Sequence, residues 1–342
     1  EDVSDVTFEI TSFNDPAGNE LTAAETHTSD DSLKSVRVDT TSPQVSTVTF
    51  ASSNLSSDPD YSDALLAKAD DRVTLSFTTD ERVDGVEVTI NGSSYSATDM
   101  GSGISWEAEH TVSSGGDAET VQFEITSFSD PSGNGLASPE THTSDDNMKS
   151  VRVDTTAPQV STVTFDSSNE ATDLDHPSSL LAKADDTLRF SFTTDERVEG
   201  VEVKINGTDY SATDMGSGTS WQAEHTLTSS ESADAVEFEI TSFNDPSGNV
   251  LVSSETHTSD NSLPLCNGCF AGMAVRVDTT APQVSTVTFA SNNTSTDPDL
   301  GSSLLAKADD TLTFTFTTDE RVEGVEVTIN GSSYSAMDMG SG

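Results

Sequence analysis

The stretch AKADDTLRFSFTTDERVEGVEVKING, residues 182–207, decides the fold. Apolar side chains occupy every second position in two short runs, which are Leu188, Phe190, Phe192 and then Val201, Val203, Ile205. A period of two is typical of a β-strand that buries one face. Asn206-Gly207 follows the second run and favours a tight hairpin turn. The stretch therefore predicts consecutive β-strands.

The sequence repeats itself. The aspartate of Val-Asp-Thr-Thr returns after 115 residues (39 to 154) and again after 124 (154 to 278). The longer interval contains an insertion, Leu263 to Ala274, which has no counterpart elsewhere. Fixed-period similarity indicates one folded unit used several times, and a unit of ~100 residues is a domain in its own right.

One repeat, read from Asp39, contains about seven short alternating segments in ~115 residues, which favours a two-sheet sandwich. Turn signals such as Asn91-Gly92 separate the segments. In the second copy we expect one set of side chains to face inward together: Phe190, Phe192, Val203, Trp221, Phe238 and Ile240.

The repeat pattern predicts four segments. Residues 1–38 hold the last strands of a partial domain, 39–153 and 154–277 are complete domains, and 278–342 hold the first strands of another partial domain. Because both ends fall within a repeat, we expect a mature product or an excerpt of a longer chain.

The chain is strongly acidic. It carries 60 Asp and Glu against 14 Lys and Arg, a formal net charge of −46, and 32% hydrophobic residues. Such a charge repels nucleic acid and anionic membrane surfaces, so neither is expected as a partner. The sequence has no apolar run long enough to insert into a bilayer. A surface suited to salty water and a chain that relies on bound cations both remain open.

Three motifs carry a family resemblance: VDTTAP (153–158), the stretch 182–207, and DPSGN (245–249). In this order and repeated, they resemble the tandem bacterial Ig-like domains of large secreted adhesins. The resemblance implies an all-β fold of tandem Ig-like β-sandwich domains in a linear array. It also implies an extracellular or cell-surface location and a role as a stalk.

Acidic side chains fall at three places that meet at one end of an Ig-like sandwich: the chain entry, the loop between the second and third strands, and the loop between the last two strands. Carboxylate and amide oxygens without Cys or His suit calcium. The candidate ligands are Asp39, Asp80, Glu81, Asp130 and Asn134; Asp154, Asp195, Glu196, Asp245 and Asn249; Asp278, Asp319 and Glu320; and Asp15 and Asn19. We expect calcium at the domain junctions. The alternative is that Asp, Pro, Gly and Asn are turn formers only.

Cys266 and Cys269 lie in the insertion. They lack the context of a redox motif, a zinc site or a haem attachment. We expect a small disulfide-closed loop, with a free thiol pair or a bridge between chains as alternatives.

We expect no enzymatic activity. The recurring histidines His27, His142 and His257 stand at one position of the repeat without a nucleophile at a plausible spacing.

The sequence thus predicts a structural component of an extracellular surface fibre, an adhesin stalk or filament, rigidified by calcium at domain junctions. The expected partners are adjacent repeats or other copies of the chain, head to tail. One alternative is a filament subunit that donates residues 1–38 into the incomplete sandwich of a neighbour's residues 278–342. Another is a carbohydrate- or surface-binding module with a glycan or cell-surface target.

Overall fold

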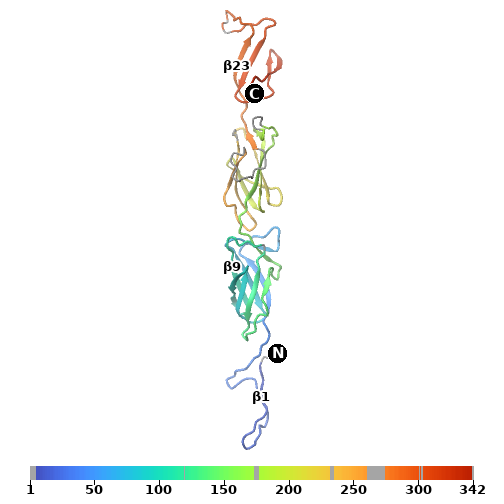
Figure 1. The fold of residues 1–342 in the computed structure, drawn as a ribbon, viewed down its shortest axis with the longest axis vertical. Coiled ribbons are helices and arrows are strands. Elements are labelled where there is room, and N and C mark those ends of the chain that lie inside the picture. Colours follow the sequence, from blue (N-terminus) through green and yellow to red (C-terminus); the bar gives the residue numbers. More distant parts are fainter. Residues whose placement is uncertain are drawn as a thin grey trace. The chain divides into compact units, whose positions relative to one another are not determined.

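A computed structural model describes residues 5–118, 120–172, 177–231, 235–259, 274–299, 301 and 303–340 (Figure 1). Every helix or strand in these residues is a β-strand, which confirms the all-β prediction. Accordingly, this part of the chain has no helix of the length and hydrophobicity that a membrane crossing requires. The insertion with Cys266 and Cys269 lies outside the described residues.

The chain divides into two compact units. The first comprises Glu1–Phe165, Arg189–Glu224 and Glu237–Gly272, and the second comprises Asp166–Leu188, His225–Val236 and Met273–Gly342.

The first unit contains one whole sandwich. One sheet has the order β3-β5-β9-β8 and the other the order β11-β10-β6-β7. The strands are β3 (Val45–Ser52), β4 (Ala64–Ala67), β5 (Arg72–Thr79), β6 (Asp84–Ile90), β7 (Ser93–Ser96), β8 (Thr98–Gly101), β9 (Ser105–Thr111), β10 (Phe123–Ser129), β11 (Glu140–His142) and β12 (Ser150–Val153).

This strand order is that of an immunoglobulin-type sandwich. If β3, β5, β6, β8, β9, β10 and β11 are lettered A to G, one sheet reads A-B-E-D and the other contains C-F-G, with β7 as C′. The short strands β4 and β12 form a parallel pair outside these two sheets. The topology therefore confirms the predicted Ig-like fold class.

The two sheets share one hydrophobic core. Every second side chain of β5 is buried, and the side chains of β6 alternate in the same way from Val86 to Ile90. The rings of Phe50 on β3 and Phe123 on β10 stack across the core with their centroids 4.1 Å apart. Trp106 is also buried, as the alternation predicts.

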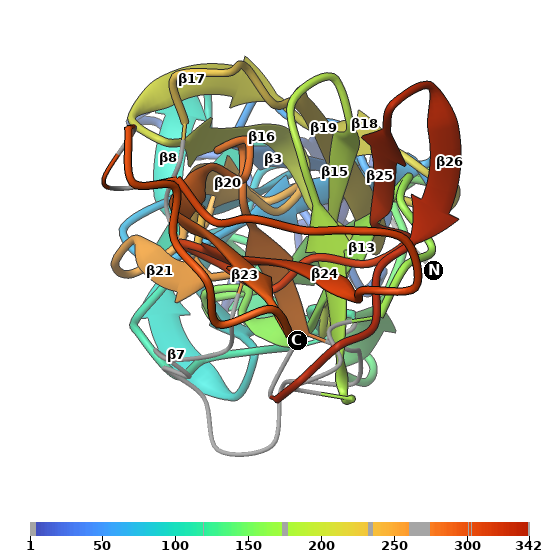
Figure 2. The ribbon, with the colours of Figure 1, turned by 90° about the horizontal axis from the view of Figure 1, so that it is seen from above.

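The second sandwich repeats this order with the sheets β13-β15-β19-β18 and β17-β16-β20-β21. In Figure 2 these strands form two layers. The bounds are β13 (Val160–Ser167), β15 (Thr187–Thr194), β16 (Glu199–Ile205), β17 (Thr208–Ser211), β18 (Thr213–Asp214), β19 (Ser220–Thr226), β20 (Glu237–Asn244) and β21 (Glu255–Thr258). All six core residues predicted for this copy are at most 7% exposed, which confirms that prediction.

Most of the second sandwich belongs to the first unit, and the second unit contains small sheets. β14 (Ser179–Ala182) pairs in parallel with β22 (Ala274–Val277). Two antiparallel pairs follow, β23 (Val284–Ser291) with β24 (Leu312–Thr318), and β25 (Glu326–Ile329) with β26 (Ser332–Ser335). Near the other terminus, in the first unit, β1 (Phe8–Ile10) pairs with β2 (Glu25–His27).

Candidate metal centre

A five-residue loop follows β20 and buries an aspartate. Asp245 accepts two hydrogen bonds from Asn249: the backbone N–H donates to Oδ1 at 2.9 Å, and the side-chain Nδ2 donates to Oδ2 at 2.8 Å. Gly248 allows the bend because its φ of +87° lies in the left-handed region. The side chain of Asp245 is thereby fixed and fully buried. The loop after β10 holds Asp130 in the same way.

The linker between the two sandwiches supplies a second carboxylate. Asp154 directly follows β12, and its backbone N–H donates to the carbonyl of Ala67 in the first sandwich at 2.9 Å. Its own carbonyl accepts the Nδ2 of Asn249 in the second sandwich, also at 2.9 Å. One residue is therefore hydrogen-bonded to both sandwiches.

Glu196, in the turn after β15, completes the cluster. Ligand oxygens of Asp154, Glu196 and Asp245 all lie within 4.8 Å of one another. The first sandwich repeats this arrangement with Asp39, Glu81 and Asp130. The topology thus brings together one residue from each of the three places that the sequence indicates, twice.

Burial and like charge make the second cluster electrostatically unfavourable. Burial raises the pKa of Glu196 to about 7, together with the negative charges of Asp154, Asp245 and Asp195. Burial also raises the pKa of Asp154, and the charges of Asp245 and Asp117 act in the same direction. A cation at this position would relieve the repulsion.

The cluster fits calcium in chemistry and size. All its ligand atoms are carboxylate oxygens, which a hard cation prefers. With Ca–O distances of about 2.3–2.6 Å, ligands on opposite sides of one ion lie about 4.6–5.2 Å apart, so three oxygens within 4.8 Å can share an ion.

Several predicted ligands have other roles in the structure. Asp80, Asp195 and Asp319 lie outside the three-carboxylate clusters, and each closes a turn by accepting the backbone N–H of Gln44, Gln159 or Gln283 at 2.7–2.8 Å. Asn134 and Asn249 use their Nδ2 groups as donors to the aspartate and to the linker carbonyl. They orient the cluster through their N–H groups, and a role for their Oδ1 oxygens as ligands stays a prediction.

The remaining predicted ligands form two sets, one of Asp278, Asp319 and Glu320 and one of Asp15 and Asn19. Each set repeats part of the arrangement described above. The pKa of Glu320 is raised by burial and by its neighbour Asp278. Asp15 and Asn19 form the same pair of hydrogen bonds as Asp245 and Asn249, and those bonds from Asn19 lower the pKa of Asp15.

Sequence reasoning missed the residues that fasten the linker. Asp117, between β9 and β10, accepts the backbone N–H of Thr155 at 2.6 Å and the hydroxyl of Thr156 at 2.8 Å. The Thr155 hydroxyl also donates to Asp117, and this bond, followed by the other two, lowers the pKa of Asp117. Only its place next to Gly115-Gly116, a loop signal, marks it in the sequence.

Two further contacts lie beside the linker. The Nδ2 of Asn54 donates to the carbonyl of Ser247 at 2.8 Å, and the Arg197 guanidinium lies 3.5 Å from a carboxylate oxygen of Asp60. Asp71 holds Asn54 in place by accepting its Nδ2 at 3.0 Å. The acidic segment after the first strand of the repeat thus contributes to the junction through hydrogen bonds and an ion pair.

The recurring histidines occupy strand positions. His142 on β11 and His257 on β21 each lie within 3.7 Å of a glutamate two residues earlier, and His257 is fully buried. This placement matches a role in packing.

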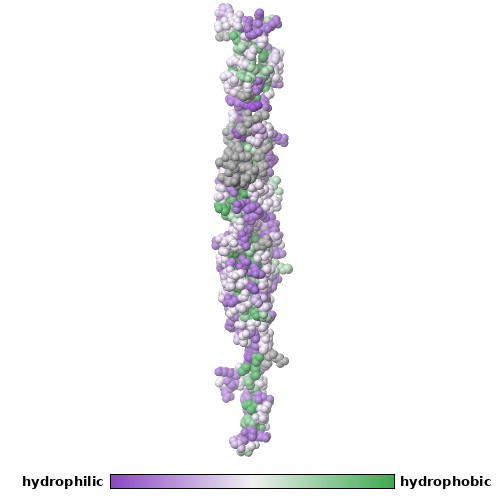
Figure 3. Space-filling model, viewed as in Figure 1, coloured by the Kyte–Doolittle hydropathy of each residue, from purple (hydrophilic) through white to green (hydrophobic). Residues whose placement is uncertain are grey.

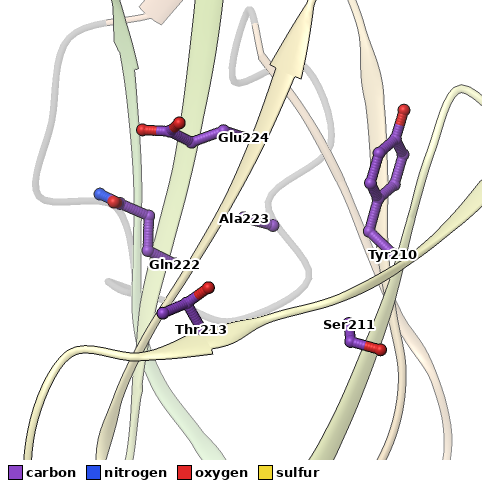
Figure 4. A pocket seen from close by; sticks show the side chains of 6 residues that line it. All are labelled: Tyr210, Ser211, Thr213, Gln222, Ala223 and Glu224. Carbon is purple, nitrogen blue, oxygen red and sulfur yellow. The ribbon is translucent and has the colours of Figure 1, made fainter.

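A shallow hollow opens between β17 and the strands β18 and β19 of the second sandwich, with a volume of about 280 Å³. Figure 4 shows Tyr210 and Ser211 on one side and Gln222 and Glu224 on the other. Three of these side chains already have hydrogen-bond partners. Arg189 donates to Glu224 at 2.8 Å, Gln222 donates to Ser191 at 3.2 Å, and Ser211 donates to Glu202 at 2.8 Å. A carbohydrate-binding role stays a prediction.

No protein-family model and no curated protein matches the sequence. Among solved structures, the chain is similar to the crystal structure of the I9–I11 tandem from titin, with 10% identity, 80% of this chain and 79% of that chain covered, and a TM-score of 0.31. It is also similar to the crystal structure of Rst D1-D2, with 10% identity, 68% of this chain and 100% of that chain covered, and a TM-score of 0.28. The strand order of its own sandwiches makes this a chain of tandem immunoglobulin-like domains.

Proposed function

We propose that this chain is a structural component of an extracellular surface fibre, such as an adhesin stalk, in which calcium fastens each domain to the next. The proposal is carried by Asp154, which is both the linker residue held by the first sandwich and a member of the acidic cluster of the second. A cation bound there would connect the two domains through one carboxylate.

The extracellular location is supported by the resemblance to secreted adhesins. Hydrophilic side chains cover much of the surface in Figure 3, and the net charge of −46 gives a soluble, self-repelling surface. Calcium sites in extracellular modules typically bind with dissociation constants of about 10⁻⁴–10⁻³ M. The clusters are partly exposed sites of three carboxylates, and such sites suit that range of dissociation constants. We propose no catalytic role for the chain.

Calcium titration tests the proposal. Calcium at about 100 times its dissociation constant should stabilise the folded state by about 2.7 kcal/mol for each site that it occupies, and a chelator should remove this gain. Calorimetry of unfolding with calcium and with chelator measures it. Identical melting temperatures in the two conditions would remove calcium from the proposal.

Matched variants locate the effect. Glu81→Gln together with Glu196→Gln removes one charge from each cluster and leaves both aspartate loops intact, so the calcium-dependent shift should largely disappear. The control is Asp209→Asn, which removes the same kind of charge from an exposed carboxylate (78% side-chain exposure) outside the clusters. The control should keep the full shift.

A further inference from the structure

The turn between β6 and β7 contains an acceptor sequence for N-linked sugar. Asn91 and Gly92 have φ values of +48° and +79°, and the backbone N–H of Asn91 donates to the carbonyl of Gln122 at 2.8 Å. Positive φ at both positions is what a type I′ turn requires and what Asn-Gly favours. The turn makes no such demand on the next residue, Ser93, which completes the tripeptide Asn-x-Ser.

The second sandwich has the same kind of tripeptide at the same place. Asn206 and Gly207, with φ values of +47° and +76°, form the turn between β16 and β17, and Thr208 follows them. The hairpin of β25 and β26 repeats the pattern at residues 330–332. A hydroxyl residue therefore follows the Asn-Gly turn in every copy of this hairpin, although the turn itself needs only Asn and Gly.

The acceptor side chains are accessible. In both complete sandwiches, the turn asparagine and the hydroxyl residue two positions later are exposed. A Cβ atom added at Gly92 or Gly207 would meet no heavy atom within 4 Å, so both turns are surrounded by open space. Within the part of the chain that the structure describes, the Asn91 side chain makes no hydrogen bond. Asn206 accepts the backbone N–H of Glu237 at 3.4 Å with its Oδ1, a bond that does not use the side-chain nitrogen.

The same tripeptide occurs at Asn54 in a different environment. Asn54 is partly buried, and its Nδ2, the atom that would carry a sugar, donates to Asp71 at 3.0 Å and to the carbonyl of Ser247 at 2.8 Å. The corresponding Asn293 also donates from its Nδ2, to Asp310 at 3.1 Å. The fold thus separates asparagines whose nitrogen is in use from those that are exposed at a turn.

We propose that Asn91 and Asn206 are sites of N-linked glycosylation. The Nδ2 nitrogen forms a bond to C1 of the sugar, and the bond between C1 and the phosphate oxygen of a lipid-linked oligosaccharide breaks. The lipid phosphate leaves with the electron pair of that bond, and the nitrogen gives one proton to a carboxylate of the transferase. Because this modification is typical of secreted proteins, the inference rests on the extracellular location in the proposed function.

The sugar on Asn91 would lie at the end of the first sandwich from which the chain continues to the linker. Gln122, which accepts the N–H of Asn91, directly follows Val121, and the N–H of Val121 donates to the carbonyl of Val151 on β12 at 2.8 Å. Strand β12 leads directly to Asp154. Each complete domain would therefore carry one neutral, hydrated group on the corresponding hairpin of an otherwise strongly acidic surface.

Peptide mapping of the native protein tests the inference. Peptides that contain Asn91 or Asn206 should carry a hexose or N-acetylhexosamine mass increment on the asparagine, and the peptide that contains Asn54 should not. Native peptides in which Asn91 and Asn206 are both unmodified would overturn the inference.

Sugar transfer in vitro separates the effect of the fold from that of the tripeptide. The folded full chain and the peptides of its digest are incubated in parallel with a purified oligosaccharyltransferase and a lipid-linked oligosaccharide. In the folded chain Asn54 should accept sugar at least about tenfold more slowly than Asn91, because its two hydrogen bonds must open first, and digestion should reduce this difference. Equal rates at the two sites of the folded chain would also count against the inference.

Matched variants in the same transfer experiment identify the acceptor. Ser93→Ala removes the tripeptide and keeps the Asn-Gly turn, so Asn91 should no longer accept sugar. The control Ser94→Ala removes the neighbouring hydroxyl, which lies outside the tripeptide, and should leave the transfer unchanged. Calcium-dependent melting is measured on the same samples, so a chain that gains stability with calcium but carries no sugar loses this inference and keeps the proposed function.

Discussion

Phe238 shows how one residue joins the two layers of the second sandwich. Its ring stacks on Phe190 with a centroid distance of 4.6 Å and lies 4.8 Å from Phe165. It is fully buried. The sequence predicted this position because period-two alternation specifies which side of a strand is apolar. It could not specify the ring partners, which come from strands more than 45 residues earlier in the sequence.

Phe238→Ala should lower the free energy of unfolding by ~3–5 kcal/mol, because the cavity cannot refill completely. Urea unfolding in chelator measures this loss, and Phe13→Ala serves as control since Phe13 is 59% exposed. A loss below about 1 kcal/mol at Phe238 would contradict the core described here.

The candidate site was predictable from the sequence only in part. The fold class was enough to bring Asp154, Glu196 and Asp245 to one end of the sandwich. The neighbours Asp195 and Glu196 could not be told apart, because local backbone direction decides that one closes a turn and the other joins the cluster. Likewise, the spacing of the DPSGN loop does not reveal that Asn249 presents its N–H groups to the aspartate.

At the scale of the element, β3 is an edge strand whose backbone is protected by side chains. Asp145 accepts the N–H of Phe50 at 3.2 Å, and Asp146 accepts the N–H of Val48 at 2.9 Å. Capping these donors leaves fewer backbone groups free to pair with a foreign strand. Alternation could not predict this protection, because it depends on a loop almost 100 residues away. Alternation also could not predict that β4 pairs with β12, because this pairing joins segments that are far apart in the sequence.

The pKa of Asp145 also leads to a prediction of how the stability of the fold depends on pH. Burial alone would raise its pKa, but the N–H groups of Lys149, Phe50 and Asn147 outweigh it, so the pKa lies below the usual 3.8. A folded-state pKa below the unfolded value contributes stability that is complete above the unfolded pKa and is lost as the pH falls through the folded one.

Asp145→Asn should therefore destabilise the chain by about 1–3 kcal/mol at pH 7, and the difference from the unaltered chain should shrink as the pH falls below about 4. Chemical unfolding at a series of pH values in chelator measures it. Asp84→Asn, an exposed carboxylate, is the control and should stay close to the unaltered chain throughout. A pH-independent difference for Asp145→Asn would show that its charge does not matter.

At the scale of the whole molecule, the repeat predicts how the chain divides but does not reveal how the two complete sandwiches are joined. The short linker after β12 is held on one side by Ala67 and Asp117 and on the other by Asn249. That arrangement depends on Asp117, which has no acidic counterpart in the second repeat, where Ser232 occupies the position.

Asp117→Ala should loosen this linker without unfolding either sandwich. Thr155 loses the acceptor of its backbone N–H and Thr156 that of its hydroxyl, so the segment 154–158 should open more often and be cut faster by a nonspecific protease. Mass spectrometry of the fragments over time gives the rate at this segment, and calorimetry should show melting temperatures close to those of the unaltered chain. Asp84→Ala removes an exposed carboxylate elsewhere and should leave the cleavage rate unchanged. Equal cleavage rates for Asp117→Ala and Asp84→Ala would mean that the Asp154 contacts alone hold the junction.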